Sequence, residues 1–145
     1  MINTGQIQIT PYNPGSVAIT GGTIAANFDE IIQAASDTLT AAELRGQTIN
    51  NYDQAAADNL QTLPTAAEGM SFVGVCGTAQ AAHYFGFKAD TNDKIYLDGT
   101  AGSDNGIVKI AAPVVGSMIY FFTFKTGVTS YDWAALTISG VWVAA

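Results

Sequence analysis

The run "GSMIYFFTF" (residues 116–124), followed after a short polar segment by "YDWAALTIS" (residues 131–139), decides the fold class of this chain. Both runs are rich in aromatic and β-branched residues, which favour strands. Similar runs bounded by turn-forming residues recur at a spacing of roughly 8–12 residues, which is typical of an antiparallel sandwich or barrel. They are "QTINNY" (47–52), "NLQTL" (59–63), "GMSFVGVCG" (69–77), "HYFGFKA" (83–89), "KIYLDG" (94–99), "GIVKIA" (106–111) and "VWVAA" (141–145). We therefore predict that residues 38–145 form one mainly β domain, an antiparallel β-sandwich of jelly-roll-like form.

The N-terminal segment differs from the rest because residues 1–28 carry no charged side chain. Alternating apolar and polar residues at 6–9 and 16–19 indicate short strands or an extended arm. An uncharged arm is costly to leave in solvent with its backbone unpaired. We therefore predict that residues 1–37 form an assembly arm, which lies on a neighbouring subunit or joins a shared sheet.

Within this arm, the segment "NFDEIIQAAS" (residues 27–36) changes to a helical period. Asn27 and Glu30 have the spacing of a capping box, which marks a helix start. The apolar residues that recur at helical spacing are Phe28, Ile31, Ile32 and Ala35. This pattern predicts one short amphipathic helix of about two to three turns.

The tetrapeptide "TAAE" occurs twice, at residues 40–43 and 65–68. The first copy belongs to "TLTAAEL" (38–44), where Thr40 and Glu43 also have capping-box spacing, but the β-rich context favours a strand. The two copies follow "TIAANFDE" (23–30) and "TINNYDQ" (48–54), so the echo has an offset of about 25 residues. Because a solenoid needs about three repeats for stability, we interpret the echo as coincidence in a chain rich in threonine and alanine.

The composition indicates assembly. Of the 145 residues 48% are hydrophobic and only 12% are charged, about half of the roughly 25% that is usual in globular domains. Low charge suggests that other chains cover much of the surface. The net charge of −7, with five basic residues spread singly, argues against a nucleic-acid partner.

No membrane association is predicted. The longest uncharged apolar run, "IAAPVVGSMIYFF" (residues 110–122), is 13 residues long and contains a proline and a glycine. A bilayer-spanning helix needs about 20 apolar residues. The first ten residues also lack the basic start and apolar run of a signal peptide, so we expect a soluble protein made in the cytoplasm.

Several segments resemble a small β-sandwich domain that is common in virion structural proteins of tailed bacteriophages, such as tail fibres and head decorations. The segments are "TLTAAE" (38–43) with Gly46, "INNY" (49–52), "TLPTAAEGMSF" (62–72), "DKIYLDG" (93–99), and "YDW" (131–133) with Gly140 before Trp142. The resemblance covers about three quarters of the chain. It implies a structural role, often as a trimer, and in some members binding to a host glycan or to a capsid surface.

Catalytic chemistry is not indicated. Cys76 is the only cysteine and His83 the only histidine, and together they could form a nucleophile and base pair. Cys76 lies in a buried-strand pattern, His83 stands beside aromatic residues, and no pattern supplies an orienting group. The carboxylates lie at turn-like or capping positions rather than in an apolar pocket. We therefore predict structural roles for both residues, no catalytic residue, no cofactor and no enzyme.

The acidic stretch "KADTNDKIYLDGTAGSDNG" (residues 88–106) is the remaining candidate site. Its spacing does not match an EF-hand, and it matches the β-roll repeat only in part. Asp98 and Asp104 are therefore only weak calcium candidates. We interpret the stretch as a turn, a strand and a hairpin loop, because aspartate, asparagine and glycine are the usual turn residues.

The sequence thus predicts a non-enzymatic structural component of a phage virion, of fibre or decoration type. It is expected to form a homotrimer through β arms and apolar faces, to contact other virion proteins, and to lie in the virion. The alternative is a carbohydrate-binding module that recognises a host glycan, for which the tyrosines could supply stacking surfaces. Tyr84, Tyr96 and Tyr120 stand inside strand runs, and we expect them to serve packing.

Overall fold

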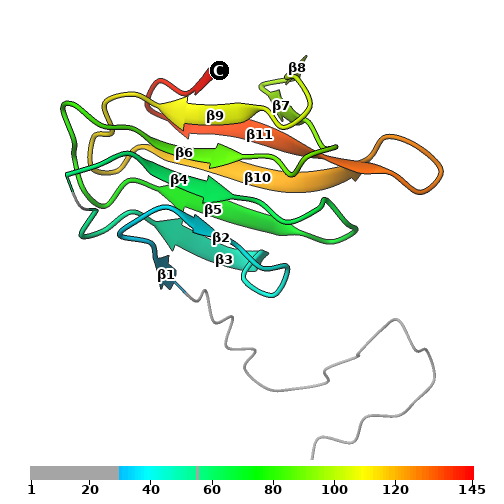
Figure 1. Cartoon of the computed structure of the whole chain (residues 1–145), viewed down its shortest axis with the longest axis horizontal. Coiled ribbons are helices and arrows are strands. Elements are labelled where there is room, and N and C mark those ends of the chain that lie inside the picture. Colours follow the sequence, from blue (N-terminus) through cyan, green and yellow to red (C-terminus); the bar gives the residue numbers. More distant parts are fainter. Residues whose placement is uncertain (1–29, 55) are drawn as a thin grey trace, which may run out of the picture.

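The computed structural model describes residues 30–54 and 56–145, which form two mixed β-sheets (Figure 1). The seven-stranded sheet has the order β1 (Glu30–Ile32), β3 (Arg45–Asn50), β5 (Ser71–Val75), β10 (Met118–Lys125), β11 (Tyr131–Ser139), β7 (Ile95–Leu97) and β8 (Thr100–Ala101). The five-stranded sheet has the order β12 (Val143–Ala144), β9 (Ile107–Ile110), β6 (Phe85–Lys88), β4 (Asn59–Thr62) and β2 (Asp37–Thr38). The mainly β prediction is therefore confirmed: nine of the twelve strands fall on the nine runs named above, whereas β1, β2 and β8 do not.

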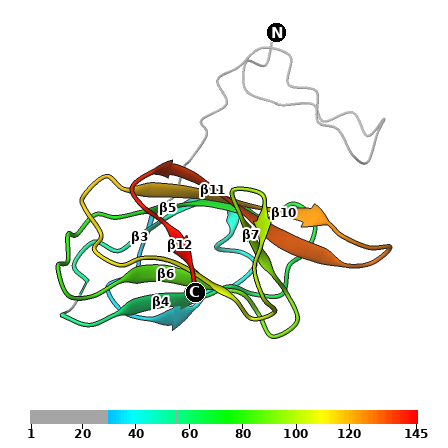
Figure 2. The same cartoon turned by 90° about the horizontal axis from the view of Figure 1, so that it is seen from above.

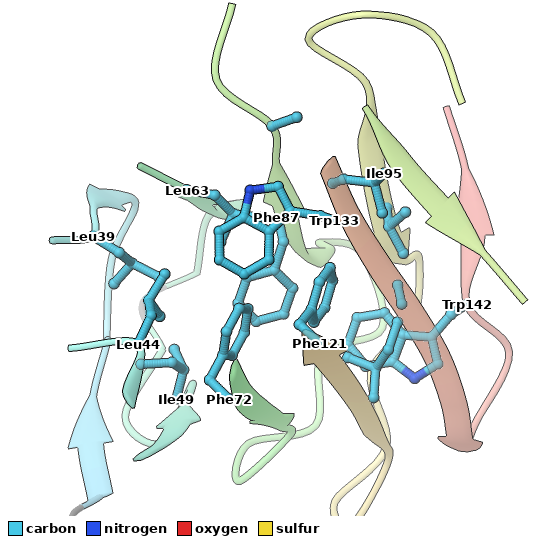
Figure 3. Packing of buried hydrophobic residues seen from close by; sticks show 14 of the residues in the cluster. Leu39, Leu44, Ile49, Leu63, Phe72, Phe87, Ile95, Phe121, Trp133 and Trp142 are labelled. Atoms are coloured by element: carbon cyan, nitrogen blue, oxygen red, sulfur yellow. The ribbon is translucent and has the colours of Figure 1, made fainter. Parts of the chain in front are cut away.

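The two sheets lie one above the other, with the apolar core between them (Figure 2). Phe72 and Phe121 of the seven-stranded sheet stack on each other at 4.7 Å between ring centroids. Phe87 of the five-stranded sheet packs on both, at 5.1 and 4.9 Å (Figure 3). Gly74 lies opposite the same ring, where a Cβ would come within 2.6 Å of the Phe87 side chain. The sheets can approach because residue 74 has no side chain.

The antiparallel prediction is correct for only part of the structure. β5, β10 and β11 pair antiparallel, as do β6 with β9, β9 with β12, and β7 with β8. Pairing is parallel between β1, β3 and β5, between β2, β4 and β6, and between β7 and β11. The cause is that from β1 to β6 the chain enters the other sheet after every strand. Neighbours in one sheet are therefore consecutive turns of a coil and run in the same direction.

This coil gives the repeated "TAAE" a structural position. The Leu39 amide donates to the Thr62 carbonyl and the Leu63 amide to the Lys88 carbonyl, both at 2.8 Å, so the two leucines lie at the same corner of consecutive turns. Each copy of "TAAE" follows one of these leucines. In β3 and β5, Ile49 pairs with Gly74, so the winding repeats at the same spacing as the echo. The two copies of "TAAE" therefore follow equivalent corners of the coil, and our interpretation of their spacing as coincidence was wrong. The earlier part of the echo includes residues 23–29, which lie outside the described residues.

The predicted helix over residues 27–36 is wrong where it can be compared. Residues 27–29 lie outside the described range, but Glu30–Ile32 form strand β1, paired in parallel with β3. The Asn50 side chain donates to the Glu30 carboxylate at 2.6 Å, and the Gln33 amide donates to the Asn50 carbonyl at 2.7 Å. Ile31 packs against the core while Ile32 is 46% exposed, so the two isoleucines face opposite sides, as in a strand. Tertiary pairing has overridden the local helical pattern.

The strand predicted over "TLTAAEL" is also wrong beyond Thr38. The Glu43 carboxylate accepts hydrogen bonds from the amide and the hydroxyl of Thr40, both at 2.7 Å, and the Glu43 amide donates to the Thr40 carbonyl. The capping-box contact therefore forms, but it closes a turn over residues 41–44 and β3 begins at Arg45. Residues 30–54 and 56–145 contain no helix, and hence none long and apolar enough to cross a membrane.

Buried amide side chains link successive turns of the coil. The Asn59 side chain donates to the Gln33 carbonyl and the Gln61 side chain to the Ala35 carbonyl, each 26 residues back along the chain. Asn51 accepts from the Gly77 amide at 2.7 Å. These bonds pair buried polar groups and hold the register between turns, although the side-chain carbonyl oxygen of Gln61 has no partner among the described residues.

We expect Phe121→Ala to lower the free energy of unfolding by about 3–5 kcal/mol, because it removes a fully buried ring that contacts both Phe72 and Phe87. Urea unfolding followed by fluorescence measures this change. Val128→Ala is the control, since Val128 is 90% exposed and should change stability by less than about 0.5 kcal/mol. Equal effects of the two substitutions would contradict the assigned core.

Candidate functional site

The surface of greatest interest is the outward side of the seven-stranded sheet, which we call the outer sheet face. Along β10, Ile119 and Phe121 are fully buried between the sheets, so Tyr120, Phe122 and Phe124 point outward. The pairing places further residues on the same side. The apolar residues of the outer sheet face are Ile32, Val73, Val75, Tyr96, Met118, Tyr120, Phe122, Phe124, Ala134, Leu136 and Ile138, and the same pairing places Glu30, Thr48, Asn50, Ser71 and Asp132 on this side as well.

Aromatic side chains are packed together on this face. Tyr120 and Phe122 stack with their ring centroids 5.7 Å apart, and Tyr96 meets Phe124 edge-on at 5.1 Å. Leu136 and Ile138 beside them on β11 are 43% and 56% exposed. An antiparallel sheet with one side in water normally carries polar residues on that side. An apolar outer side therefore indicates a surface that another molecule covers.

The sequence of β10 explains why the face forms. In "MIYFFTF" (residues 118–124) aromatic or aliphatic residues occupy both the inward and the outward positions. In a strand with one side in water, apolar and polar residues would alternate instead. Charged groups lie at the margins of the face. Glu30 is on the edge strand β1, and Asp132 is at the start of β11, where its carboxylate accepts from the Lys94 amide at 2.9 Å.

An apolar hollow of about 650 Å³ lies at one end of the sheets, between the loop before β10 and the loop after β11. Val114, Val115 and Val141 in its lining are 64%, 65% and 77% exposed. Ser139 belongs to its rim and donates to the Gly116 carbonyl at 2.8 Å, which ties the two loops together. No charged side chain lines this hollow. It therefore adds to the apolar surface near the end of β11.

A second hollow, of about 410 Å³, is polar and lies at another place in the fold; we call it the polar hollow. Its lining comes from four segments: Thr65 and Ala66; Asn92, Asp93 and Lys94; Asp104; and Thr126, Thr129, Ser130, Tyr131 and Asp132. The Asp93 carboxylate accepts from the Ala66 amide at 2.6 Å, and the Lys94 ammonium lies 3.6 Å from the Asp104 carboxylate. Hydroxyl, amide and carboxylate groups thus surround a space large enough for a small polar ligand.

Asp93 has an altered acidity. Its burial raises the pKa above the ordinary value, the carboxylates of Asp90 and Asp132 raise it further, and the hydrogen bond from the Ala66 amide opposes the rise. In contrast, the hydrogen bond from Thr65 lowers the pKa of Asp90. Among the described residues, no three or more histidine, cysteine, aspartate or glutamate side chains are arranged to hold a metal ion.

The weak calcium candidates have separate partners. Asp98 accepts from the Thr137 amide at 2.9 Å and from the Thr137 hydroxyl at 2.8 Å, and with Gly99 it forms the turn between β7 and β8. Both residues have positive φ, 48° and 85°, as the type I′ turn of a two-residue hairpin requires. Asp104 instead faces Lys94. The turn and the strand predicted in residues 88–106 are confirmed, but the predicted hairpin loop is in part a second strand, β8, which pairs with β7 after the two-residue turn.

Cys76 and His83 are placed apart. Cys76 is fully buried, its backbone bonds to Gly116 and Ser117, and burial raises the pKa of its thiol to about 12. His83 precedes β6 and lies 3.4 Å from the Asp58 carboxylate. No hydrogen bond joins the two residues in the described part of the chain. A thiol with so high a pKa is a poor nucleophile at neutral pH.

The remaining aromatic side chains have different surroundings. Trp142 is buried and donates to the Ser139 carbonyl at 3.0 Å, whereas the buried indole N–H of Trp133 has no partner among the described residues. Tyr84 lies under the Lys109 ammonium at 4.9 Å. Tyr96 and Tyr120 do pack on neighbouring rings, but they do so on the outer sheet face rather than in the core.

Comparison with family models, with curated proteins and with solved structures finds no match.

We expect Asp93→Asn to gain stability relative to the wild type as the pH rises from 3 to 7. Because the folded-state pKa of Asp93 is raised, the folded wild type binds this proton more tightly than the unfolded chain and loses stability as the pH rises through that pKa. The asparagine does not titrate, and its amide oxygen can still accept from the Ala66 amide. Thermal unfolding across this pH range measures the difference, and a decline of the variant relative to the wild type with rising pH would contradict the assignment.

Proposed function

We propose that this protein is a non-enzymatic structural component of a phage virion, of fibre or decoration type, that self-assembles as a homotrimer. The observation that carries the proposal is the outer sheet face, where Tyr120, Phe122 and Phe124 stand outward on the central strand β10. Such a face is suited to pack against the same face of another copy or against another virion protein. The β-sandwich interpretation of the two sheets belongs to the same proposal.

The charge distribution supports an assembly role. Only 12% of the residues are charged, and the centre of the outer sheet face is built from aromatic, aliphatic and small residues. Aromatic residues and methionine are enriched in the buried centres of protein interfaces, whereas lysine, glutamate and aspartate are depleted there. The Glu30 and Asp132 side chains at the margins correspond to a polar rim.

The virion setting and the trimer rest on the resemblance of "TLTAAE", "TLPTAAEGMSF", "DKIYLDG" and "YDW" to phage structural proteins. Most of these segments occupy defined places in the fold. The first forms the corner between the sheets, "DKIYLDG" forms β7 and its hairpin turn, and "YDW" begins β11. The predicted assembly arm covers residues 1–37, of which residues 30–32 form β1, Asp37 begins β2, and residues 1–29 lie outside the described residues. The proposed location is the virion, after synthesis in the host cytoplasm.

Light scattering on the purified chain tests the assembly. We expect a particle of three times the chain mass of 15.1 kDa at micromolar concentration, and we expect Phe122→Lys to shift it to the monomer mass because a buried charge is costly at an interface. Val128→Lys is the control, since Val128 lies in the exposed loop between β10 and β11. A wild-type monomer, or an equal loss of assembly in both variants, would contradict the proposal.

A second candidate function, binding of a host carbohydrate, is favoured by the polar hollow. Its hydroxyl, amide and carboxylate groups suit the hydroxyl groups of a sugar, and Tyr131 is among its lining residues. If this hypothesis is correct, the protein binds one saccharide on a glycan array reproducibly. The binding should be lost in Asn92→Ala and in Tyr131→Ala but kept in Val128→Ala. Binding that is absent, or that survives both substitutions, would dismiss it.

A further inference from the structure

The two loops that border the apolar hollow carry valines at exposed positions, where turn segments usually have polar residues. They are residues 114–117, before β10, and residues 140–141, after β11. The hollow therefore lies at the end of the β10–β11 hairpin opposite the loop of residues 126–130 (Figure 1). Its volume of about 650 Å³ is within the range of roughly 300–1,000 Å³ that is usual for small-molecule sites.

Hydrogen bonds within the described structure hold the walls of the hollow in place. The Gly116 amide donates to the Cys76 carbonyl at 2.8 Å, and the Ser117 amide donates to the Val114 carbonyl at 2.9 Å. The Ser139 hydroxyl donates to the Gly116 carbonyl at 2.8 Å and so joins the two loops. The hollow is therefore present in the fold before anything binds, as is usual for small-molecule sites.

One polar side chain in the lining is both buried and unpaired. Ser117 is only 6% exposed, yet its hydroxyl has no hydrogen-bond partner in residues 30–54 and 56–145. The hydroxyl lies against Gly140, where a Cβ would come within 2.8 Å of its oxygen. Because Gly140 has a φ of 87° and no side chain, it leaves this hydroxyl open to the hollow. A buried hydroxyl is costly to leave without a partner, so Ser117 marks the place where a bound molecule would pair.

We propose that the apolar hollow binds an uncharged small molecule with an apolar body and one hydroxyl or carbonyl group. The body contacts Val114, Val115 and Val141, and the polar group pairs with the Ser117 hydroxyl. The lining contains no charged side chain and the chain has a net charge of −7, so a carboxylate would find no counter-ion there. The proposal goes beyond the proposed virion assembly and does not depend on it.

Titration of the full chain with 1-octanol, followed by NMR of the methyl groups, tests the site. We expect saturable shifts of the Val114, Val115 and Val141 methyl signals. The Val128 signals should not move, because the length of β10, roughly 26 Å, separates that residue from the hollow. Octanoate has the same chain length but carries a charge, and it should bind at least about tenfold more weakly than 1-octanol.

Two variants separate the roles of the lining residues. Val141→Asp should abolish the saturable shifts, and because Val141 is 77% exposed the fold should be kept. Val128→Asp is the matched control, since it places the same charge on an exposed valine outside the hollow. Ser117→Ala should weaken 1-octanol binding roughly two- to tenfold through the lost hydrogen bond. It should leave the binding of toluene, which has no hydrogen-bonding group, unchanged.

The proposal is overturned if 1-octanol gives no saturable shifts, if octanoate binds as well as 1-octanol, or if Ser117→Ala leaves 1-octanol binding unchanged. Light scattering on Val141→Asp should find the wild-type particle mass. A fall to a smaller mass in this variant alone would show that a second copy covers the hollow, and this would also overturn the proposal. A wild-type monomer that still binds 1-octanol would contradict the proposed trimer and support the site, so the two failures are distinguishable.

Discussion

The contact between the two sheets through Phe72, Phe87 and Phe121 is the constraint on which the described structure depends. These rings lie in the middle of the core and come from adjacent strands in one sheet and a central strand in the other. Gly74 allows the approach, because any side chain there would collide with the Phe87 ring. Because Phe121 on β10 points inward to this cluster, Tyr120, Phe122 and Phe124 point outward. The assembly proposal is based on this outward orientation.

The chain's path between the sheets has a second consequence. From β1 to β6 the strands alternate between sheets, so sequence neighbours are never sheet neighbours and the pairing is parallel. Buried amides of Asn51, Asn59 and Gln61 then bond from one turn to the next. The C-terminal strands β10 and β11 form an ordinary hairpin instead. The protein therefore combines a short coil with an antiparallel unit in the same two sheets.

Sequence patterns found the strands well and their arrangement less well. Runs such as "SFVGV" and "IYFFTF" indicate strands because they are rich in aromatic and β-branched residues and are bounded by turn residues. Parallel pairing was missed because direction depends on where each connection leads, which local patterns do not encode. The helix was predicted because Ile31 and Ile32 fit a helical stripe, whereas pairing with β3 turns them to opposite sides. The "TAAE" repeat was the one sequence signal of the coil.

The candidate surfaces differ in how far a sequence can reveal them. The outer sheet face is visible in β10 itself, because apolar residues occupy both the inward and the outward positions, although for Tyr96 and Tyr120 we expected only that they serve packing. The polar hollow is assembled from four segments between residues 65 and 132, and only the fold brings them together. Asp98 and Asp104 stand six positions apart in the sequence, yet the hairpin turn directs one to Thr137 while the other meets Lys94.

Assembly through the outer sheet face is tested most directly by an electron cryomicroscopy structure of the particle that the full chain forms. We expect copies to meet through this face, with Tyr120 and Phe122 buried between them. A particle in which this face remains open to solvent, while copies join through another surface, would contradict it.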